Sequence, residues 1–482
     1  MKKAYYFLVV ITAFIFGCAN VELDENPPSL LSPDTFYTTE SEFQAALVGS
    51  FKALYSDWVG FDYGDPLILT SGAEDVRSDA GIFINFDRLS PNGNDRGVKI
   101  VWEQLYKCIA NTNALIGNLD NAKDITDQRL GEIEGQAKFL RAFSFFHLVR
   151  WWGEVQLTTF ENQTDIKNLK QASVAEIYES IIQDLKRAEQ TLPTSFSGEP
   201  GRPTQGAAKA LLAKVYLTMA GWPIEDAANY ALARDKAKEV MGMYSLEPNF
   251  ADLWKNENKF NNEFIFTFYA SIDNGGGFTG SHMHTASRHW GNGEDGWGDF
   301  YSEDRFFEAF PESPRKEATF TSTYADGTYW EDAGTQPHMA KYRDAGNTVG
   351  NNGEGFVVML RYADVLLTFA EASNMAEGSP STEALEAVNQ IRRRAMGLDI
   401  NTPDGGVDLP SGMSQTDFDS AVLDERNWEL AFEFNRWFDL VRKKMVVEVN
   451  KDLHPNVTEN NRLLPKPNAQ LIPGFLEQNE GY

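Results

Sequence analysis

Six aromatic residues lie within a 41-residue stretch that is rich in glycine, asparagine and aspartate, and their types fit carbohydrate chemistry. They are Trp290, Trp297, Tyr301, Tyr324, Tyr329 and Trp330, beside Arg288, Asn292, Asp295 and Asp299. Sugars present apolar C–H faces that stack on rings, while their hydroxyl groups need polar partners. A second set lies in or beside residues 60–97: Trp58, Tyr63, Asp75, Arg77, Asp79, Phe83 and Phe86. The two sets predict a ligand site, although any single ring could instead pack under its own loop.

Three histidines in the same stretch, His282, His284 and His289, could ligate a transition metal. No nearby cysteine completes a known metal-binding spacing, and the acidic residues there lack the spacing of an EF-hand loop. The sequence therefore predicts no metal site and no cofactor, with calcium as the open alternative.

Glu429 and Glu433 lie one helical turn apart, and paired carboxylates are the catalytic groups of glycosidases. Arg426, Arg436, Asp439 and Arg442 interleave with them, so ion pairs at i,i+3 and i,i+4 explain the acids without catalysis. The same argument covers Arg361, Asp364 and Glu371. Since the chain also has no nucleophile elbow, P-loop or dinucleotide fingerprint, we expect no enzymatic activity.

The first 18 residues have the pattern of an export signal that ends in a lipidation site. Lys2 and Lys3 precede an apolar run of about 13 residues, which is short for a membrane span, and Gly17 and Cys18 follow. We therefore predict a signal peptide over residues 1–17, acylation of Cys18 and an acidic tether to residue 40. A retained signal anchor is the alternative.

The charge of the chain argues against nucleic acid as a partner. Removing residues 1–17 deletes two lysines and no acidic residue, so the formal charge falls from −27 to −29. Membrane attachment would then depend on the acyl chains. Cys18 and Cys108 are the chain's cysteines, and lipidation of Cys18 would leave no intramolecular disulfide.

Helical periodicity predicts the elements that must position these residues. The expected helices span 41–55, 99–119, 131–151, 174–192, 205–220, 224–241, 358–377, 382–396 and 416–444. Residues 60–97 and 270–355 read as long loops, and such loops usually carry function. Alternation over residues 261–270 predicts a strand, so the expected class is mainly α with a minor β component.

Four long motifs make the chain resemble the SusD/RagB family of outer-membrane lipoproteins through nearly its whole length. They are Glu134–Leu157, Gly201–Leu217, Leu360–Ala372 with Val388–Ala395, and Glu425–Arg442. The closing segments Leu463–Pro467 and Gln478–Tyr482 resemble the family's C-terminal end.

The resemblance implies one SusD-like domain over residues 41–482, with tetratricopeptide-like helical hairpins at about 41–59, 98–260 and 356–445. The loops at about 60–97 and 270–355 would face the ligand. It also implies outward display on the outer membrane, capture of an extracellular oligosaccharide or polysaccharide, and delivery to a SusC-like TonB-dependent barrel. A RagB-like peptide binder, a surface glycosidase and a lid without a ligand are the alternatives.

Overall fold

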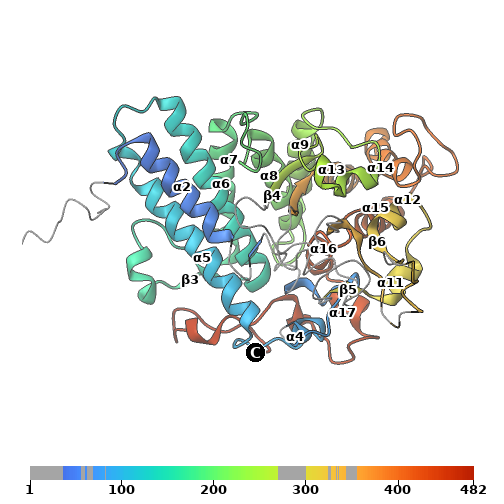
Figure 1. The fold of residues 1–482 in the computed structure, drawn as a ribbon. Helices are drawn as coiled ribbons and strands as arrows, with labels where there is room; N and C mark the ends of the chain where they lie inside the picture. Colours follow the sequence, from blue (N-terminus) through green and yellow to red (C-terminus); the bar gives the residue numbers. More distant parts are fainter. Residues whose placement is uncertain are drawn as a thin grey trace, which may run out of the picture.

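Helices make up most of the computed structural model, which describes residues 36–55, 60–61, 69–81, 83–269, 300–323, 327–332, 334, 336–342 and 355–482. The main helices are α2 (Glu40–Leu54), α5 (Arg96–Gly117), α6 (Asp127–Trp152), α7 (Val174–Thr191), α8 (Gln205–Ala220), α9 (Ala228–Val240), α13 (Tyr362–Glu377), α14 (Thr382–Ala395) and α15 (Gln415–Glu429). Consecutive helices from α5 to α9 pack on one another, and α13 continues the row against α9 (Figure 1). The predicted mainly α class, with stacked helical hairpins, is confirmed.

Side-chain caps set where several of these helices begin. Thr39 and Ser173 form complete capping boxes at α2 and α7, and Thr204, Ser381 and Ser414 each accept a backbone N–H at the start of their helices. The predicted starts at 174, 205 and 382 agree with the structure because these capping signals are local in the sequence.

Two predicted helices are wrong in part. Residues 358–361 belong to β8 (Phe356–Arg361), and α13 begins only at Tyr362. The β-branched pair Val357–Val358 suits a strand, and β8 pairs antiparallel with β4 (Phe264–Tyr269). The expected strand at 261–270 is confirmed as β4.

The helix predicted over 416–444 is also broken. α15 ends at Glu429, and α16 (Arg436–Arg442) begins after a turn in which Phe432 and Phe434 have φ values of 64° and 62°. Left-handed backbone is costly for phenylalanine, so the surrounding contacts must stabilise this turn. Apolar periodicity continues through the turn and hides it from sequence reading.

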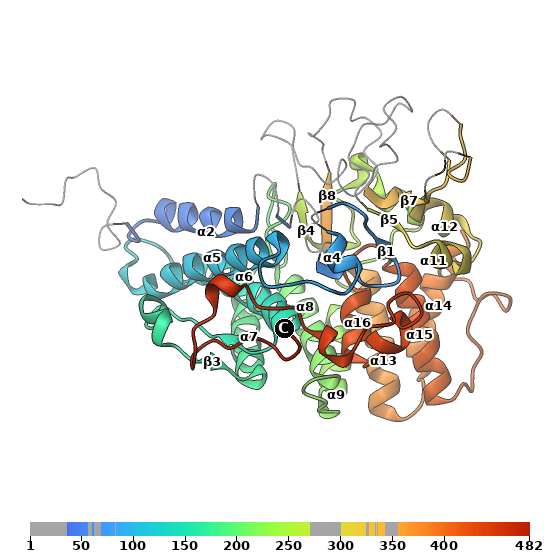
Figure 2. The same ribbon diagram turned by 90° about the horizontal axis from the view of Figure 1, so that it is seen from below.

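Short elements occupy the two predicted loop regions and the remaining connections. The helices are α4 (Ile84–Asp87), α11 (Asp304–Ala309), α12 (Pro314–Thr319) and α17 (Val446–Asn450). The strands are β1 (Val76–Arg77), β2 (Val155–Gln156), β3 (Gln171–Ala172), β5 (Tyr301–Ser302), β6 (Phe320–Thr321) and β7 (His338–Met339). Figure 2 shows β1, β4, β5, β7 and β8 toward one side of the molecule, with α7, α9 and α13 toward the other.

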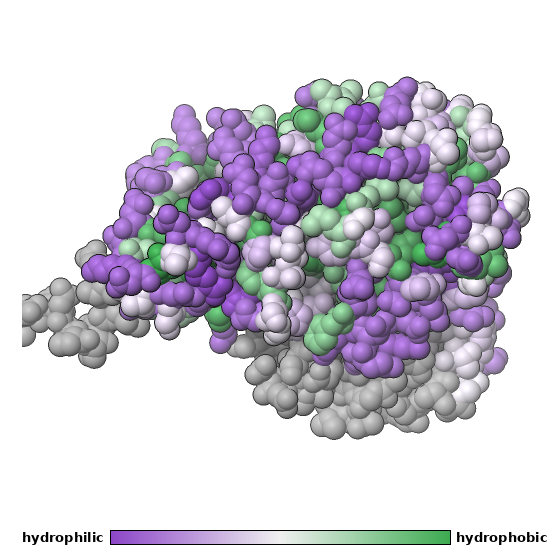
Figure 3. Space-filling model, turned by 90° about the horizontal axis from the view of Figure 1, so that it is seen from above, coloured by the Kyte–Doolittle hydropathy of each residue, from purple (hydrophilic) through white to green (hydrophobic). Residues whose placement is uncertain are grey.

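The C-terminal segment crosses back to the end of α6 and is held there by hydrogen bonds. The indole N–H of Trp152 donates to the Pro465 carbonyl over 2.9 Å, and the Leu464 N–H donates to the Trp151 carbonyl over 2.7 Å. The face seen from above is mostly hydrophilic, with small scattered apolar patches (Figure 3). No helix in the part of the chain that the structure describes is both long and apolar enough to cross a membrane.

Candidate functional site

The two predicted loop regions meet in a short antiparallel pairing. β1 and β5 are in register with Val76 opposite Ser302 and Arg77 opposite Tyr301. Next to this pair, the rings of Phe83 and Phe300 stack with their centroids 4.8 Å apart. Residues more than 200 positions apart in the sequence therefore join the two loop regions, through contacts that are mostly buried.

Arg77 is held in place by an acidic neighbour. Its Nε donates to Asp87 Oδ1 over 2.7 Å and its Nη2 donates to Asp87 Oδ2 over 3.2 Å, while Glu303 lies 3.6 Å away. The backbone N–H of Ser78 donates to the same Asp87 carboxylate. A bidentate pair of this kind orients the guanidinium, and the Arg77 side chain keeps partial contact with solvent beside Tyr301.

Asp75 lies inside the protein rather than on its surface. The residue is only 4 % exposed, and one carboxylate oxygen accepts the Phe432 N–H over 3.1 Å. Burial raises the pKa of Asp75 to about 6, more than the Phe432 hydrogen bond lowers it. Asp75 thus supports the turn between α15 and α16, and it is not placed to meet a ligand hydroxyl.

Replacing Asp75 with asparagine should flatten the pH dependence of stability. A carboxyl whose pKa is higher in the folded state favours folding below its unfolded pKa and loses that contribution as pH rises through about 6. The free energy of unfolding that Asp75 contributes at low pH and loses at neutral pH is on the order of 3 kcal/mol. Urea unfolding between about pH 4 and 8 measures it. Asp79→Asn, at an exposed position of the same loop, is the matched control. If the free energy of unfolding still falls as pH rises in Asp75→Asn, another group causes that pH dependence.

Tyr329 and Trp330 form an aromatic pair near β6, in which Tyr329 is exposed and Trp330 is half-buried. Their ring centroids are 5.8 Å apart, Tyr329 is 38 % exposed, and Phe307 supports Trp330 edge-on at 5.8 Å. The backbone N–H of Trp330 donates to the Ser322 carbonyl over 3.0 Å. A ring backed in this way is a platform on which the apolar face of a ligand can stack.

The remaining predicted site residues differ in burial, and several of them lie outside the described residues. Phe83 is buried against Phe300 of the other loop region, Asp79 is exposed, and Tyr301 is half-buried on β5. Cys18, Arg288, Trp290, Asn292, Asp295 and Trp297, with the three loop histidines, lie outside the described residues. Within the described ranges, no group of His, Cys, Asp or Glu side chains is arranged to hold a metal ion.

Glu429 and Glu433, the pair that resembles glycosidase carboxylates, lie in the interior among arginine and lysine side chains. The Glu429 carboxylate meets Arg361 at 2.7 Å, Arg394 at 2.6 Å and Arg315 at 2.9 Å. Burial alone would raise the pKa of Glu429, but these arginines hold it well below its usual range. A fully paired, ionised carboxylate without access to solvent is not available as a general acid.

We call this group the Glu429 cluster. Its cations are Arg315, Lys341, Arg361 and Arg394, and its carboxylates are Glu263, Glu425, Glu429 and Glu433. The expectation that ion pairs occupy these acids is confirmed, but the expected local partners were wrong for Glu429 and Glu433. Their arginines come from β8, α12 and α14, because both carboxylate side chains point into the core. The expected local partners were also wrong for Arg361, Asp364 and Glu371, whose partners come from other elements.

Next to it lies the Asp439 cluster, composed of Lys214, Arg426, Arg442 and Lys443 with Asp364, Glu371, Asp419 and Asp439. Here the predicted local pairing is present, since Arg442 contacts Asp439 at 2.8 Å with i,i+3 spacing. Arg426 reaches both Asp364 and Asp439 at 2.8 Å and ties α13, α15 and α16 together.

A hollow of about 400 Å³ lies between α2 and α5 and was not predicted from the sequence. Its lining includes Gly49, Lys52, Tyr55, Gln104 and Lys107, a mixture of small, aromatic and polar side chains. A Cβ added at Gly49 would meet no atom within 4 Å, so this glycine leaves the hollow open. Helical periodicity carries no signal for the place where two helices diverge.

Two family models match the chain. The model described as "SusD family" matches residues 312–473, and the one described as "Starch-binding associating with outer membrane" matches residues 76–217. A SusD-like protein of Formosa agariphila is 29 % identical over 100 % of both chains. These matches support a SusD-like family protein. A second SusD-like protein, from Bacteroides ovatus, is 25 % identical over 91 % of this chain and 82 % of its own.

Solved SusD-like structures share the fold. A SusD superfamily protein from Parabacteroides distasonis matches with a TM-score of 0.79 at 26 % identity, over 92 % of this chain and 99 % of its own. A SusD homologue from Bacteroides thetaiotaomicron gives 0.82 at 23 %, over 93 % and 98 %. A laminarin-binding SusD-like protein gives 0.76 at 24 %, over 92 % and 100 %. The recognition of the family from its motifs is therefore confirmed.

Proposed function

We propose that this SusD-like protein captures an extracellular oligosaccharide or polysaccharide without cleaving it and delivers it to a SusC-like TonB-dependent transporter. Acylated Cys18 would anchor it to the outer membrane, facing outward. The carrying observation is the β1–β5 pairing, which brings the two aromatic-rich loop regions together on a SusD-like scaffold. The relatives described as laminarin-binding or surface glycan-binding support the same ligand class.

The described residues supply both kinds of contact that a sugar needs. Tyr329 and Trp330 offer ring faces, while Arg77 offers an oriented cationic donor beside Tyr301. Stacking on a few rings with several hydrogen bonds corresponds to micromolar to millimolar binding, or about −8 to −4 kcal/mol. Such affinity suits a protein that releases its cargo to a transporter, and it requires no cofactor.

The test is calorimetric titration of the full chain in a detergent without a sugar headgroup, against a panel of polysaccharides and a peptide digest. Tyr329→Ala should weaken polysaccharide binding by about 2- to 10-fold, the equivalent of one aromatic stacking contact. Phe160→Ala is the matched control, because Phe160 is 39 % exposed, close to the value for Tyr329, but lies in the connection between β2 and β3 with its ring against Gly117 at the end of α5. Figure 1 shows β3 and β6 on opposite sides of the molecule. Trp290→Ala and Trp297→Ala extend the test to the remaining loop.

Further measurements separate the alternatives. Binding to peptides alone would move the ligand class to the RagB-like alternative, and release of reducing ends from a bound polysaccharide would show a glycosidase. Titration with calcium and with EDTA tests whether a metal contributes. Gly49→Leu fills the hollow between α2 and α5, and a loss of affinity there would place the ligand on that hollow as well.

A further inference from the structure

Arg150 is a buried cation that lacks a carboxylate partner. It lies on α6 and is 8 % exposed, and no carboxylate in the described ranges comes within the 4.0 Å of a salt bridge. Its Nε donates to the Phe146 carbonyl over 3.1 Å. The rings of Phe146 and Phe438 cover the guanidinium, with centroids 3.9 Å and 3.7 Å from Cζ. The rings offset part of the cost of burying this charge.

The other buried charges nearby are matched. The Glu429 cluster contains four buried cations and four carboxylates, and the half-buried Arg392 also reaches its Glu425 at 3.3 Å. The Asp439 cluster contains four cations and four carboxylates. Arg150 belongs to neither cluster and adds one positive charge to this part of the interior. Although burial lowers the pKa of Arg150 to about 9, the guanidinium stays protonated at neutral pH. A buried charge without a counter-ion is strongly unfavourable.

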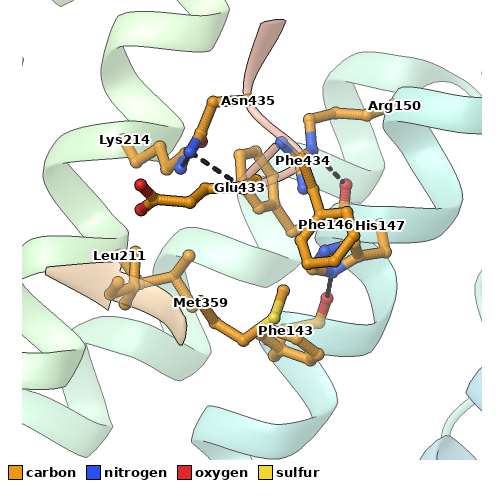
Figure 4. A pocket seen from close by; sticks show the side chains of 11 residues that line it. Phe143, Phe146, His147, Arg150, Leu211, Lys214, Met359, Glu433, Phe434 and Asn435 are labelled. Carbon is orange, nitrogen blue, oxygen red and sulfur yellow. Dashed lines mark hydrogen bonds between the residues drawn. The ribbon is translucent and has the colours of Figure 1, made fainter. Parts of the chain in front are cut away.

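Arg150 lines a cavity of about 20 Å³ between α6, α8 and the turn before α16. Lys214 lines the opposite side, and the Glu433 carboxylate points away from Arg150 (Figure 4). Lys214 donates to Asp364 over 2.8 Å and to Asn435, which uses two of the three protons on its ammonium group. The space suits one particle of the size of a water molecule or a halide ion.

The neutral groups around the cavity do not supply the missing negative charge. His147 donates from Nδ1 to the Phe143 carbonyl over 2.9 Å, and burial, reinforced by Arg150, holds its pKa well below the usual value. Leu211, Met359 and Phe434 complete an apolar wall. Such a wall lowers the local polarity and strengthens the attraction between the two cations and an anion.

We propose that this cavity is a binding site for a small monovalent inorganic anion of the chloride type, held by charge-assisted hydrogen bonds from Arg150 and Lys214. A phosphate or a sulfate is too large for the space. The ion would neutralise the unmatched charge and connect α6, α8 and the segment at Phe434–Asn435, so its effect would appear in stability. The proposal is independent of the glycan function.

The decisive test uses the native full chain. Crystals grown with sodium bromide should show an anomalous peak bonded to Arg150 in this cavity, and density for water alone would overturn the proposal. In solution, thermal unfolding followed by tryptophan fluorescence should show a melting temperature about 2 °C higher in chloride than in gluconate at equal ionic strength.

Variants separate the site from a general salt effect. Arg150→Met should lose the difference between chloride and gluconate, whereas Arg187→Met should keep it, because Arg187 pairs with Glu134 at the surface. A difference that persists in Arg150→Met would overturn the assignment of the ion to this cavity. Should Arg150→Met fail to fold, the bromide measurement on the native chain still decides.

Discussion

Replacing Glu429 with glutamine is expected to lower the free energy of unfolding by about 3–5 kcal/mol, the usual cost of breaking a buried ion pair on one side. Glu429 is fully buried and receives hydrogen bonds from Arg361, Arg394 and Arg315. Glutamine keeps the shape but places an amide where the arginines need an anion. The loss leaves excess positive charge in the interior, and urea unfolding at pH 7 measures it.

Glu312→Gln is the matched control for this substitution. The Glu312 side chain is 87 % exposed, lies just before α12 and pairs with Lys316 at i,i+4. An ion pair with its carboxylate in solvent contributes less than about 1 kcal/mol. A Glu429→Gln variant that unfolds at the same urea concentration as Glu312→Gln would contradict the structural role of the Glu429 cluster. Folded Glu429→Gln protein should bind glycan with unchanged affinity, so the substitution separates an effect on stability from an effect on binding.

The free energy of unfolding should fall steeply as the pH is lowered, because protonation also removes the negative charge of buried, ion-paired carboxylates. The pKa values of Glu371, Asp364 and Glu429 lie well below their usual range, because burial, which would raise them, is outweighed by paired lysines and arginines. A carboxyl whose folded pKa is depressed stabilises the protein above its unfolded pKa, and this stabilisation is lost as pH falls toward the folded value. The loss begins near the ordinary values of 4.5 for glutamate and 3.8 for aspartate.

Three such carboxyls correspond to a slope of up to roughly 4 kcal/mol per pH unit. Urea unfolding at intervals from about pH 6 to pH 3 measures this slope. Glu371→Gln should lower the slope by about 1.4 kcal/mol per pH unit, since one proton fewer is taken up on unfolding. Glu312→Gln should leave it unchanged, and a shallow, equal slope in all three proteins would contradict the pairing seen around Glu371.

Much of the helical scaffold was predictable because its signals are local. In α14, Leu385, Val388 and Ile391 recur at helical spacing, and Val388 and Ile391 are fully buried as expected. Apolar side chains on two faces of α6 are typical of a helix between neighbours, and α6 packs against α5 and α7. The starts of α7 and α8 follow from their capping residues.

The candidate site was predictable only as two regions and a set of residue types. Sugar-binding chemistry can be inferred from the clustering of tryptophan, tyrosine, arginine and aspartate. That Arg77 lies opposite Tyr301, while Asp75 turns inward to the Phe432 N–H, depends on contacts across more than 200 residues. Alternation along a chain shows which side chains share a face, but it does not show which distant segment covers that face.

The sequence by itself determined the helical class, most helix boundaries, the family and the regions where ligand chemistry gathers. Tertiary structure alone decided where the long C-terminal helix breaks, which arginines pair with Glu429, and that Arg150 is left without a carboxylate. Hydrophobic periodicity is set by the helix repeat and acts over a few residues. Buried charges are instead paired by the approach of side chains from different elements, and this approach exists only when the whole chain has packed.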